Sequence, residues 1–358
     1  MPVIERVFGL AEDLLRTASP YGAERTLAEL LASRFDRNEV REVLRAGDSL
    51  CVVPRPLRAG VPRIVLAGHL DTVPELTPNP VRRDGERLFG TGASDMKGAL
   101  AVIVDALERA VREAPRHDLV GVLYAREEGP FEASGLPEIL AVAGERVLDA
   151  SLAILMEPTD GRIELGCMGA AQARVVFEGK RAHAARPWQG VNALHAAGPL
   201  LARLKSRAPR EVVIGGLPWR EVVSATTVAF RGALNVVPDR CELGLNLRFA
   251  PGRTRDDVVR ELEELVAGEA EVAIESLWPA GCVVTGHPLV AELRAACGGA
   301  AVSSKQAWTD VGRLSELGVP AVNWGPGAVS QAHQAGEWIE LRAIAEASRA
   351  LGSWLWPE

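Results

Sequence analysis

The chain has 358 residues, of which 47% are hydrophobic and 24% are charged, so it can bury a large core and is not intrinsically disordered. Its length predicts two domains, or one domain with an insertion. The net charge of −7 and the pI of about 5.6 argue against a nucleic acid or an anionic membrane as partner. Five cysteines lie far apart without a CxxC pair, which argues against a disulfide framework and against a zinc ribbon.

The sequence predicts neither a targeting segment nor a membrane-spanning helix. No apolar run reaches the roughly 18 residues that a membrane helix needs. The first residues, MPVIERVFGLAEDLL, carry acidic side chains where a signal peptide has an uninterrupted apolar stretch. These features predict a cytoplasmic protein.

The first half of the chain alternates between helical and strand-like patterns. An amphipathic helix opens the chain and ends at the TASPYG turn, before a second helix over 24–35. Later segments in this half divide into apolar strands at 63–69, 119–125 and 151–157 and helices at 96–114 and 135–143. This alternation is typical of an α/β fold, in which helices cover both faces of a mostly parallel sheet.

The pattern changes after residue 170 and returns after residue 285. The middle segment reads as a strand at 171–179, a helix at 190–206, two or three strands between 221 and 250, a helix at 254–267 and a strand from 271. The last segment reads as helices at 287–297, 309–317 and 339–355 and a strand at 319–324. We therefore predict an α/β domain made of residues 1–170 and 286–358, interrupted by an α+β domain over 171–285.

Polar side chains follow several predicted strands at their carboxyl ends, where open α/β sheets bind ligands. They are His69, Asp71, Asp95, Glu127, Glu128, Glu157 and His333. So many carboxylates and imidazoles cannot be buried at one sheet edge without a countercharge, which a divalent metal supplies. Imidazole with carboxylate and no thiolate favours zinc, with cobalt or manganese as substitutes. The number of ligands fits two ions that share a carboxylate.

Position alone predicts a role for three of these residues. Asp71 lies two residues after His69, on the same side of the strand, so its carboxylate can hold the imidazole. Neighbouring side chains at a strand end point apart, so one of Glu127 and Glu128 can bind metal while the other stays free. The free carboxylate would be a general base for metal-activated water that attacks a carbonyl group.

Three other interpretations are weaker. GTGASD (90–95) resembles a dinucleotide-binding loop, but Asp95 replaces its third glycine and would repel a pyrophosphate. Ser94 and Lys97 form the S-x-x-K motif of serine acylases, whose accompanying SDN and KTG motifs are absent from the sequence. A non-catalytic binding or scaffolding protein is the third alternative, and an inactive member would be expected to have lost a ligand or the base.

Four segments together resemble the di-zinc amidohydrolase and exopeptidase family, which includes aminoacylases, acetylornithine deacetylases, carboxypeptidases and succinyl-diaminopimelate desuccinylases. They are AGHLDTVP (67–74), GASDMKG (92–98), EEG (127–129) and MEPT (156–159). The resemblance covers essentially the whole chain and implies a catalytic domain of the zinc-exopeptidase type with two zinc ions. It also implies an inserted lid and dimerisation domain.

The same resemblance implies a role for each candidate residue at the sheet edge. Asp95 would bridge the two ions, and the Asp95–Met96 peptide bond would be cis. The other roles follow residue by residue: His69 and Glu157 would complete one metal site, Glu128 and His333 the other, with Glu127 as catalytic base and Asp71 behind His69.

Candidate substrate contacts also follow from the resemblance. The segment around His183 is similar to the family's lid motif, whose histidine stabilises the developing oxyanion, from its own chain or from a partner subunit. Asn235 and Arg248 lie in segments that match other parts of the lid, and are candidates for binding a substrate carboxylate. Thr309 and Gly325 would line the floor of the site. The lid implies a homodimer.

Within the family, GCMG (166–169) and the segment 307–327 are most similar to the desuccinylase branch. This implies removal of succinate from a small molecule, N-succinyl-LL-2,6-diaminopimelate, by attack of a bridging metal-bound hydroxide. One departure is GPGAVSQAH (325–333), where desuccinylases commonly carry an Asn. Acetylornithine deacetylase, or another aminoacylase or peptidase of the family, therefore stays the alternative.

Overall fold

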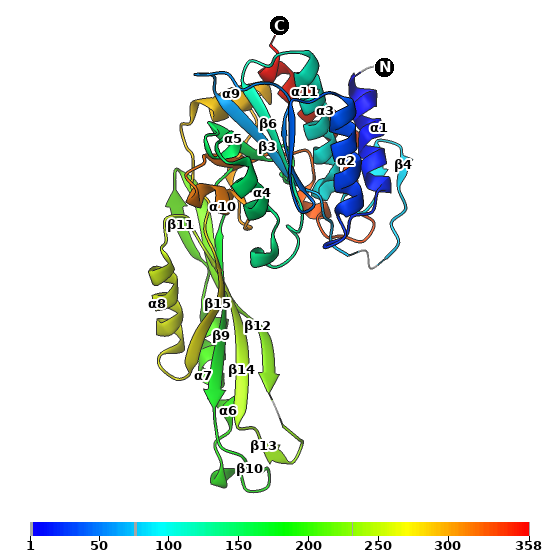
Figure 1. The fold of residues 1–358 in the computed structure, drawn as a ribbon. Helices are drawn as coiled ribbons and strands as arrows, with labels where there is room; N and C mark the ends of the chain where they lie inside the picture. Colours follow the sequence, from blue (N-terminus) through cyan, green and yellow to red (C-terminus); the bar gives the residue numbers. More distant parts are fainter. Residues whose placement is uncertain (1–2, 75–76, 231, 358) are drawn as a thin grey trace. The chain divides into compact units, whose positions relative to one another are not determined.

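The computed structural model describes residues 3–74, 77–230 and 232–357, which form two compact units (Figure 1). The first unit comprises the chain up to Leu165, Val284–Ser303 and the chain from Leu314 on. The second unit comprises Gly166–Val283 and Ser304–Arg313. Residues Ser304–Arg313 were predicted to belong to the α/β domain. They join the second unit because the side chains of Ser304 and Gln306 donate hydrogen bonds to the main-chain oxygens of Pro218 and Arg220.

The first unit is built on an eight-stranded sheet in the order β1-β2-β6-β3-β7-β17-β8-β16. The strands are β1 (Glu42–Ala46), β2 (Ser49–Val53), β3 (Arg63–His69), β6 (Asp118–Tyr124), β7 (Leu152–Leu155), β8 (Ile163–Leu165), β16 (Val302–Ser304) and β17 (Ala321–Asn323). The central strands β6, β3, β7 and β17 are parallel neighbours. The predicted α/β fold with a mostly parallel sheet is confirmed, although β1, β2 and β8, which pair antiparallel, were not foreseen.

Helices cover both faces of this sheet. They are α1 (Val3–Arg16), α2 (Arg25–Arg37), α3 (Gly98–Arg112), α4 (Leu136–Ala143), α5 (Glu145–Leu148), α9 (Pro288–Ala296), α10 (Val311–Glu316) and α11 (Leu341–Leu355). All residues of β6 are buried, as expected for a strand covered on both sides. Gly68 lets α3 approach β3, because a Cβ atom there would lie 3.1 Å from the Leu100 side chain and 3.2 Å from the Ile103 side chain of this helix. A small sheet of β4 (Arg82–Asp84), β5 (Arg87–Phe89) and β18 (Trp338–Glu340) completes this unit.

The second unit is a five-stranded antiparallel sheet in the order β11-β12-β14-β9-β15, with helices on one face. Its strands are β9 (Gly169–Glu178), β11 (Arg210–Ile214), β12 (Leu217–Phe230), β14 (Arg240–Phe249) and β15 (Glu271–Trp278), with the short pair β10 (Ala182–His183) and β13 (Val236–Val237). Its helices are α6 (Ala193–Ala196), α7 (Gly198–Ser206) and α8 (Arg255–Val266). Alternate residues such as Phe177 and Leu245 face a core shared with these helices. The helix expected over 190–206 is two helices, because Pro199 lies in the first turn of a new helix that begins at Gly198.

Among the described residues, no helix combines the length and the apolar character that a membrane crossing requires.

Candidate metal centre and active site

The candidate metal ligands lie at one edge of the central sheet. Strand β3 ends at His69, and the loops after β6, β7 and β17 carry the other ligands, which are Glu127 or Glu128, Glu157 and His333. Because the carboxyl ends of parallel strands meet at the same edge, four separate segments supply side chains to one place. Asp95 comes from the turn that leads into α3, which packs against β3.

Asp95 lies between the two histidines. Its Oδ1 is 3.1 Å from His69 Nε2, and its Oδ2 is 3.6 Å from His333 Nε2. Each carboxylate oxygen therefore faces a different imidazole, which is the orientation that a carboxylate bridging two ions requires. The Asp95–Met96 peptide bond is cis, as predicted.

The remaining ligands form two groups that share Asp95. Ligand atoms of His69, Asp95 and Glu157 lie within 4.8 Å of one another, and so do those of Asp95, Glu128 and His333. These are the two sets that the sequence resemblance assigns. Two imidazoles and three carboxylates match the nitrogen and oxygen ligands of zinc and similar ions, so the residues present fit a pair of divalent metals.

The electrostatics of the centre favour a cation. Burial acts to lower the pKa of His69, but the hydrogen bond with Asp95 and the charges of Glu157 and Glu127 raise this pKa well above its usual value. The hydrogen bond with Glu128 likewise raises the pKa of His333. Both imidazoles therefore hold protons more tightly than usual, and metal ions compete with these protons for the same nitrogen atoms.

Asp71 is completely buried and holds the loop that carries the two glutamates. Its Oδ1 accepts the N–H of Glu127 at 3.0 Å, and its Oδ2 accepts the N–H of Glu128 at 2.8 Å. Its main-chain oxygen lies 3.0 Å from His69 Nδ1, whereas its carboxylate is 3.7 Å away. Donation from Nδ1–H to this oxygen leaves Nε2 as the free ligand nitrogen. Asp71 thus contacts His69 mainly through its backbone.

Glu127 and Glu128 do not point apart as expected. Each has a carboxylate oxygen within 4.8 Å of the same His69 ring nitrogen. The alternation of a strand does not apply, because β6 ends at Tyr124 and Arg126 has a left-handed backbone with φ of 62°. Buried Glu24 accepts the N–H of Arg126 at 3.2 Å, which helps to hold this turn.

Within the second unit, the structure brings His183 and Asn235 together. His183 pairs with Val236 across β10 and β13, and the N–H of Ala184 donates to the main-chain oxygen of Asn235 at 2.8 Å. The N–H of Ala185 donates to His183 Nδ1 at 3.0 Å. The neutral imidazole therefore carries its proton on Nε2, where it can be donated to a ligand.

Arg248 and Thr309 lie together at the other end of the second unit. Arg248 pairs with Ala170 across β14 and β9, and its guanidinium lies 6.0 Å from the Trp278 ring. Trp278 packs on Trp308, which precedes Thr309. Arg240, at the opposite end of β14, is eight residues away, or about 27 Å along an extended strand. The four candidates in the second unit, three from the predicted lid and Thr309 from the predicted floor, therefore form two separated pairs.

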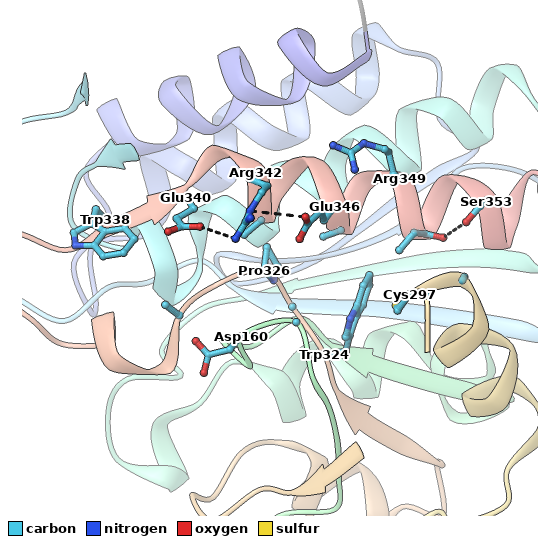
Figure 2. Close-up of a pocket in the computed structure, with 18 residues that line it drawn as sticks. Asp160, Cys297, Trp324, Pro326, Trp338, Glu340, Arg342, Glu346, Arg349 and Ser353 are labelled. Atoms are coloured by element: carbon cyan, nitrogen blue, oxygen red, sulfur yellow. Dashed lines mark hydrogen bonds and ion pairs between the residues drawn. The ribbon is translucent and has the colours of Figure 1, made fainter. Parts of the chain in front are cut away.

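Gly325 lies in the first unit, against the segment that carries Glu157. A Cβ atom at Gly325 would lie 2.3 Å from the main-chain oxygen of Met156, and its N–H donates to Thr159 Oγ1 at 3.1 Å. It also lines a cavity of about 730 Å³ beside α11, with Trp324 on its wall and Arg342 between two glutamates (Figure 2). Of the described residues that line this cavity, none is a candidate metal ligand. The contacts of Gly325 thus support the backbone that carries a ligand.

Comparison with known proteins identifies the family. The model of Peptidase family M20/M25/M40 matches residues 65–356. The chain belongs to this peptidase family. It is 39% identical over 316 residues, 88% of this chain and 87% of the relative, to a Mycobacterium tuberculosis protein named provisionally as a succinyl-diaminopimelate desuccinylase.

Two further matches extend over nearly the whole chain. The succinyl-diaminopimelate desuccinylase of Corynebacterium glutamicum is 34% identical over 355 residues, 97% of this chain and 95% of the relative. The structure of a tripeptidase from Staphylococcus aureus matches with a TM-score of 0.82 at 19% identity, covering 97% and 96% of the two chains, and this match shows the shared fold. The M20 family is dinuclear and metal-dependent, so this M20 chain is a metallohydrolase that acts on an amide bond.

Sequence reasoning missed one residue of this M20 centre. Glu337 is buried, and its carboxylate accepts the N–H of Asp95 at 2.9 Å. Burial raises the pKa of Glu337 to about 7, against the effect of hydrogen bonds from Asp95 and Gly92. The sequence signal was only an acidic residue four positions after His333, in a segment that contains no strand or helix pattern.

Proposed function

We propose that this chain removes the succinyl group from N-succinyl-LL-2,6-diaminopimelate, giving succinate and LL-2,6-diaminopimelate. The observation that carries the proposal is the 39% and 34% identity, over most of each chain, to relatives named as desuccinylases of this substrate. The two ligand groups around Asp95 support metal-dependent hydrolysis of the amide. The cytoplasmic location predicted from the sequence stays part of this proposal.

We assign the two ions per chain to zinc, with cobalt or manganese as substitutes, because the ligands combine imidazole with carboxylate and lack thiolate. His69 and Glu157 would hold one ion, Glu128 and His333 the other, and Asp95 both. When bound, the ions would polarise the amide carbonyl and lower the pKa of a water molecule.

In this mechanism Glu127 moves the proton. Its carboxylate lies near His69 and Glu128 and belongs to neither ligand group that contains Asp95, which supports the role of base that the family resemblance gives it. Glu127 takes a proton from this water as the water oxygen bonds to the carbonyl carbon. The proton then passes to the amide nitrogen as the carbon–nitrogen bond breaks, and the water oxygen remains in the succinate carboxylate. Asp71 holds Glu127 in place through the main-chain N–H.

His183 is the proposed donor to the oxyanion, through Nε2–H, and Arg248 the proposed partner of a substrate carboxylate. His183 lies in the β10–β13 pair, next to the Arg240 end of β14, whereas Arg248 lies near the other end of this strand, about 27 Å away, so one small substrate cannot touch both in the same chain. Their separation supports a homodimer in which His183 and Asn235 act on the site of the partner subunit.

Strand β12 offers an edge through which two copies can associate. It pairs with β14 over Val222–Phe230, but β11 covers its other side only at Leu217–Glu221. Among the described residues, no strand pairs with the remaining edge, where Val228 and Phe230 are more than half exposed. A long apolar edge of this kind favours pairing with another chain.

The dimer is tested by light scattering of the purified chain. We expect twice the 38.2 kDa mass of one chain, and the monomer mass after Val228→Glu, because a charge on the edge opposes strand pairing. Val213→Glu, at an exposed apolar residue of β11, is the matched control and should remain a dimer. A monomeric wild-type chain would contradict the proposal.

The substrate is tested on a panel of N-succinyl-diaminopimelate, N-acetylornithine and a simple N-acetyl amino acid, with zinc-loaded and chelator-treated enzyme. We expect cleavage of the succinyl substrate alone, abolished by the chelator and restored by zinc. Cleavage of only an acetylated substrate would assign the chain to a deacetylase or aminoacylase. If no substrate were cleaved, the proposed reaction would be wrong.

A further inference from the structure

The side chain of Glu337 forms hydrogen bonds to the loop that carries Asp95, the proposed bridging ligand. It is 2% exposed, and both of its carboxylate oxygens accept main-chain N–H groups. Oε1 accepts those of Ser94 at 2.7 Å and Asp95 at 2.9 Å, and Oε2 accepts that of Gly92 at 2.6 Å. Three of four consecutive peptide groups in this loop are therefore fixed by a single side chain.

The neighbours of Glu337 tie the same two segments together. Ser94 Oγ donates to the main-chain oxygen of Trp338 at 2.9 Å and accepts the N–H of Ala328 at 3.2 Å. The main-chain oxygen of Glu337 accepts the N–H of Gly90 at 3.1 Å. Since Glu337 follows His333 by four residues, the segment that carries one metal ligand also fixes the loop that carries another.

A negative charge at this position is costly for the isolated protein. The Asp95 carboxylate is a neighbouring like charge, and the positive charges that interact with Glu337 include those of buried Lys97 and of His333. Three N–H donors offset only part of the cost of burying a carboxylate. A carboxylate is favoured over a neutral acceptor at this position if cations bind close by, because they stabilise its negative charge.

We propose that Glu337 is a positioning residue that holds Asp95 in its bridging orientation between His69 and His333. This inference rests on the two-ion centre of the proposed function and adds a residue outside the ligand set. Glutamine at this position would place an NH₂ group against at least one N–H donor of the loop, so it cannot accept all three hydrogen bonds. Aspartate keeps the charge but is one methylene too short to reach the three donors together.

The test measures metal binding by the full chain, without substrate. Zinc affinity of the wild type, Glu337→Gln and Glu337→Asp is determined by competition with a chelating dye, and Co²⁺ titrations are followed by visible absorption. We expect both variants to bind the two ions about 10- to 100-fold more weakly, with a changed Co²⁺ spectrum. At saturating metal we expect a lower kcat and a nearly unchanged KM.

Asp118→Asn is the matched control, because Asp118 is a buried carboxylate that also accepts a main-chain N–H, at the opposite end of the sheet. It should lower the melting temperature and leave metal affinity unchanged. Wild-type affinity and spectrum in both Glu337 variants would overturn the proposal, as would weak binding in the Gln variant alone, which would indicate a role of charge only. Because no readout of metal binding uses the succinyl substrate, a failure of the proposed reaction would be seen separately.

Discussion

Replacing Glu127 with glutamine is expected to lower kcat about 10²- to 10⁴-fold, because the water that attacks the amide loses its proton acceptor. The variant should retain two metal ions per chain, since Glu127 belongs to neither ligand group around Asp95. Metal content by atomic emission and kcat for the substrate identified in the panel are the two measurements. Glutamine has nearly the same shape as glutamate, so the loop held by Asp71 should keep its conformation.

Glu132→Gln is the matched control, because Glu132 is an exposed glutamate a few residues further along the same loop. It should retain the wild-type kcat. A Glu127→Gln enzyme with near wild-type turnover would show that another group takes the proton. Loss of a metal ion from this variant would instead place Glu127 among the ligands, as its distance from His69 and Glu128 permits.

His183→Ala is expected to lower kcat about 10²- to 10³-fold, the usual effect of removing one donor to an oxyanion. Metal content should be unchanged, because His183 lies in the second unit and the candidate ligands lie in the first. The control is His195→Ala, at an exposed histidine of the same unit, which should behave as the wild type.

Mixing the two inactive variants tests which chain supplies His183. If it acts on the partner's site, a dimer of one Glu127→Gln chain and one His183→Ala chain contains one complete site, and random mixing should restore about a quarter of the wild-type activity. No restoration in a mixture shown to exchange subunits would mean that His183 serves its own chain. Loss of metal from His183→Ala would place this imidazole among the ligands.

The fold was predictable to the extent that its elements have strong periodic patterns. The buried strands β3, β6 and β7 and the amphipathic helices α3, α8 and α11 lie close to their expected ranges. Strands β1 and β2 were missed because a short hairpin before the first apolar run has no parallel-sheet pattern, and β1 is only partly buried. The end of the inserted unit depends on hydrogen bonds between residues 86 positions apart, which a local pattern does not contain.

The candidate metal centre was likewise predictable only in part. Residues next to strand ends, such as His69 and Glu157, follow from the topology of a parallel sheet. The contact of the Asp71 side chain with two N–H groups, 56 and 57 residues further on, depends on a loop conformation that no spacing rule gives. Glu337 was missed for a related reason, because the N–H groups that donate hydrogen bonds to its carboxylate come from residues 245 and 243 positions earlier in the chain.

The order of the ligands along the chain has a consequence for biosynthesis. The residues proposed for one metal ion, His69, Asp95 and Glu157, all precede the second unit, whereas the other ion also needs His333, which follows it. A nascent chain therefore presents one set of ligands to the cell well before the second unit has been translated. The second set, and the hydrogen bonds of Glu337 to the loop that carries the shared Asp95, can form only after His333 and Glu337 have been synthesised, so the two-ion centre cannot be completed before the second unit has been translated.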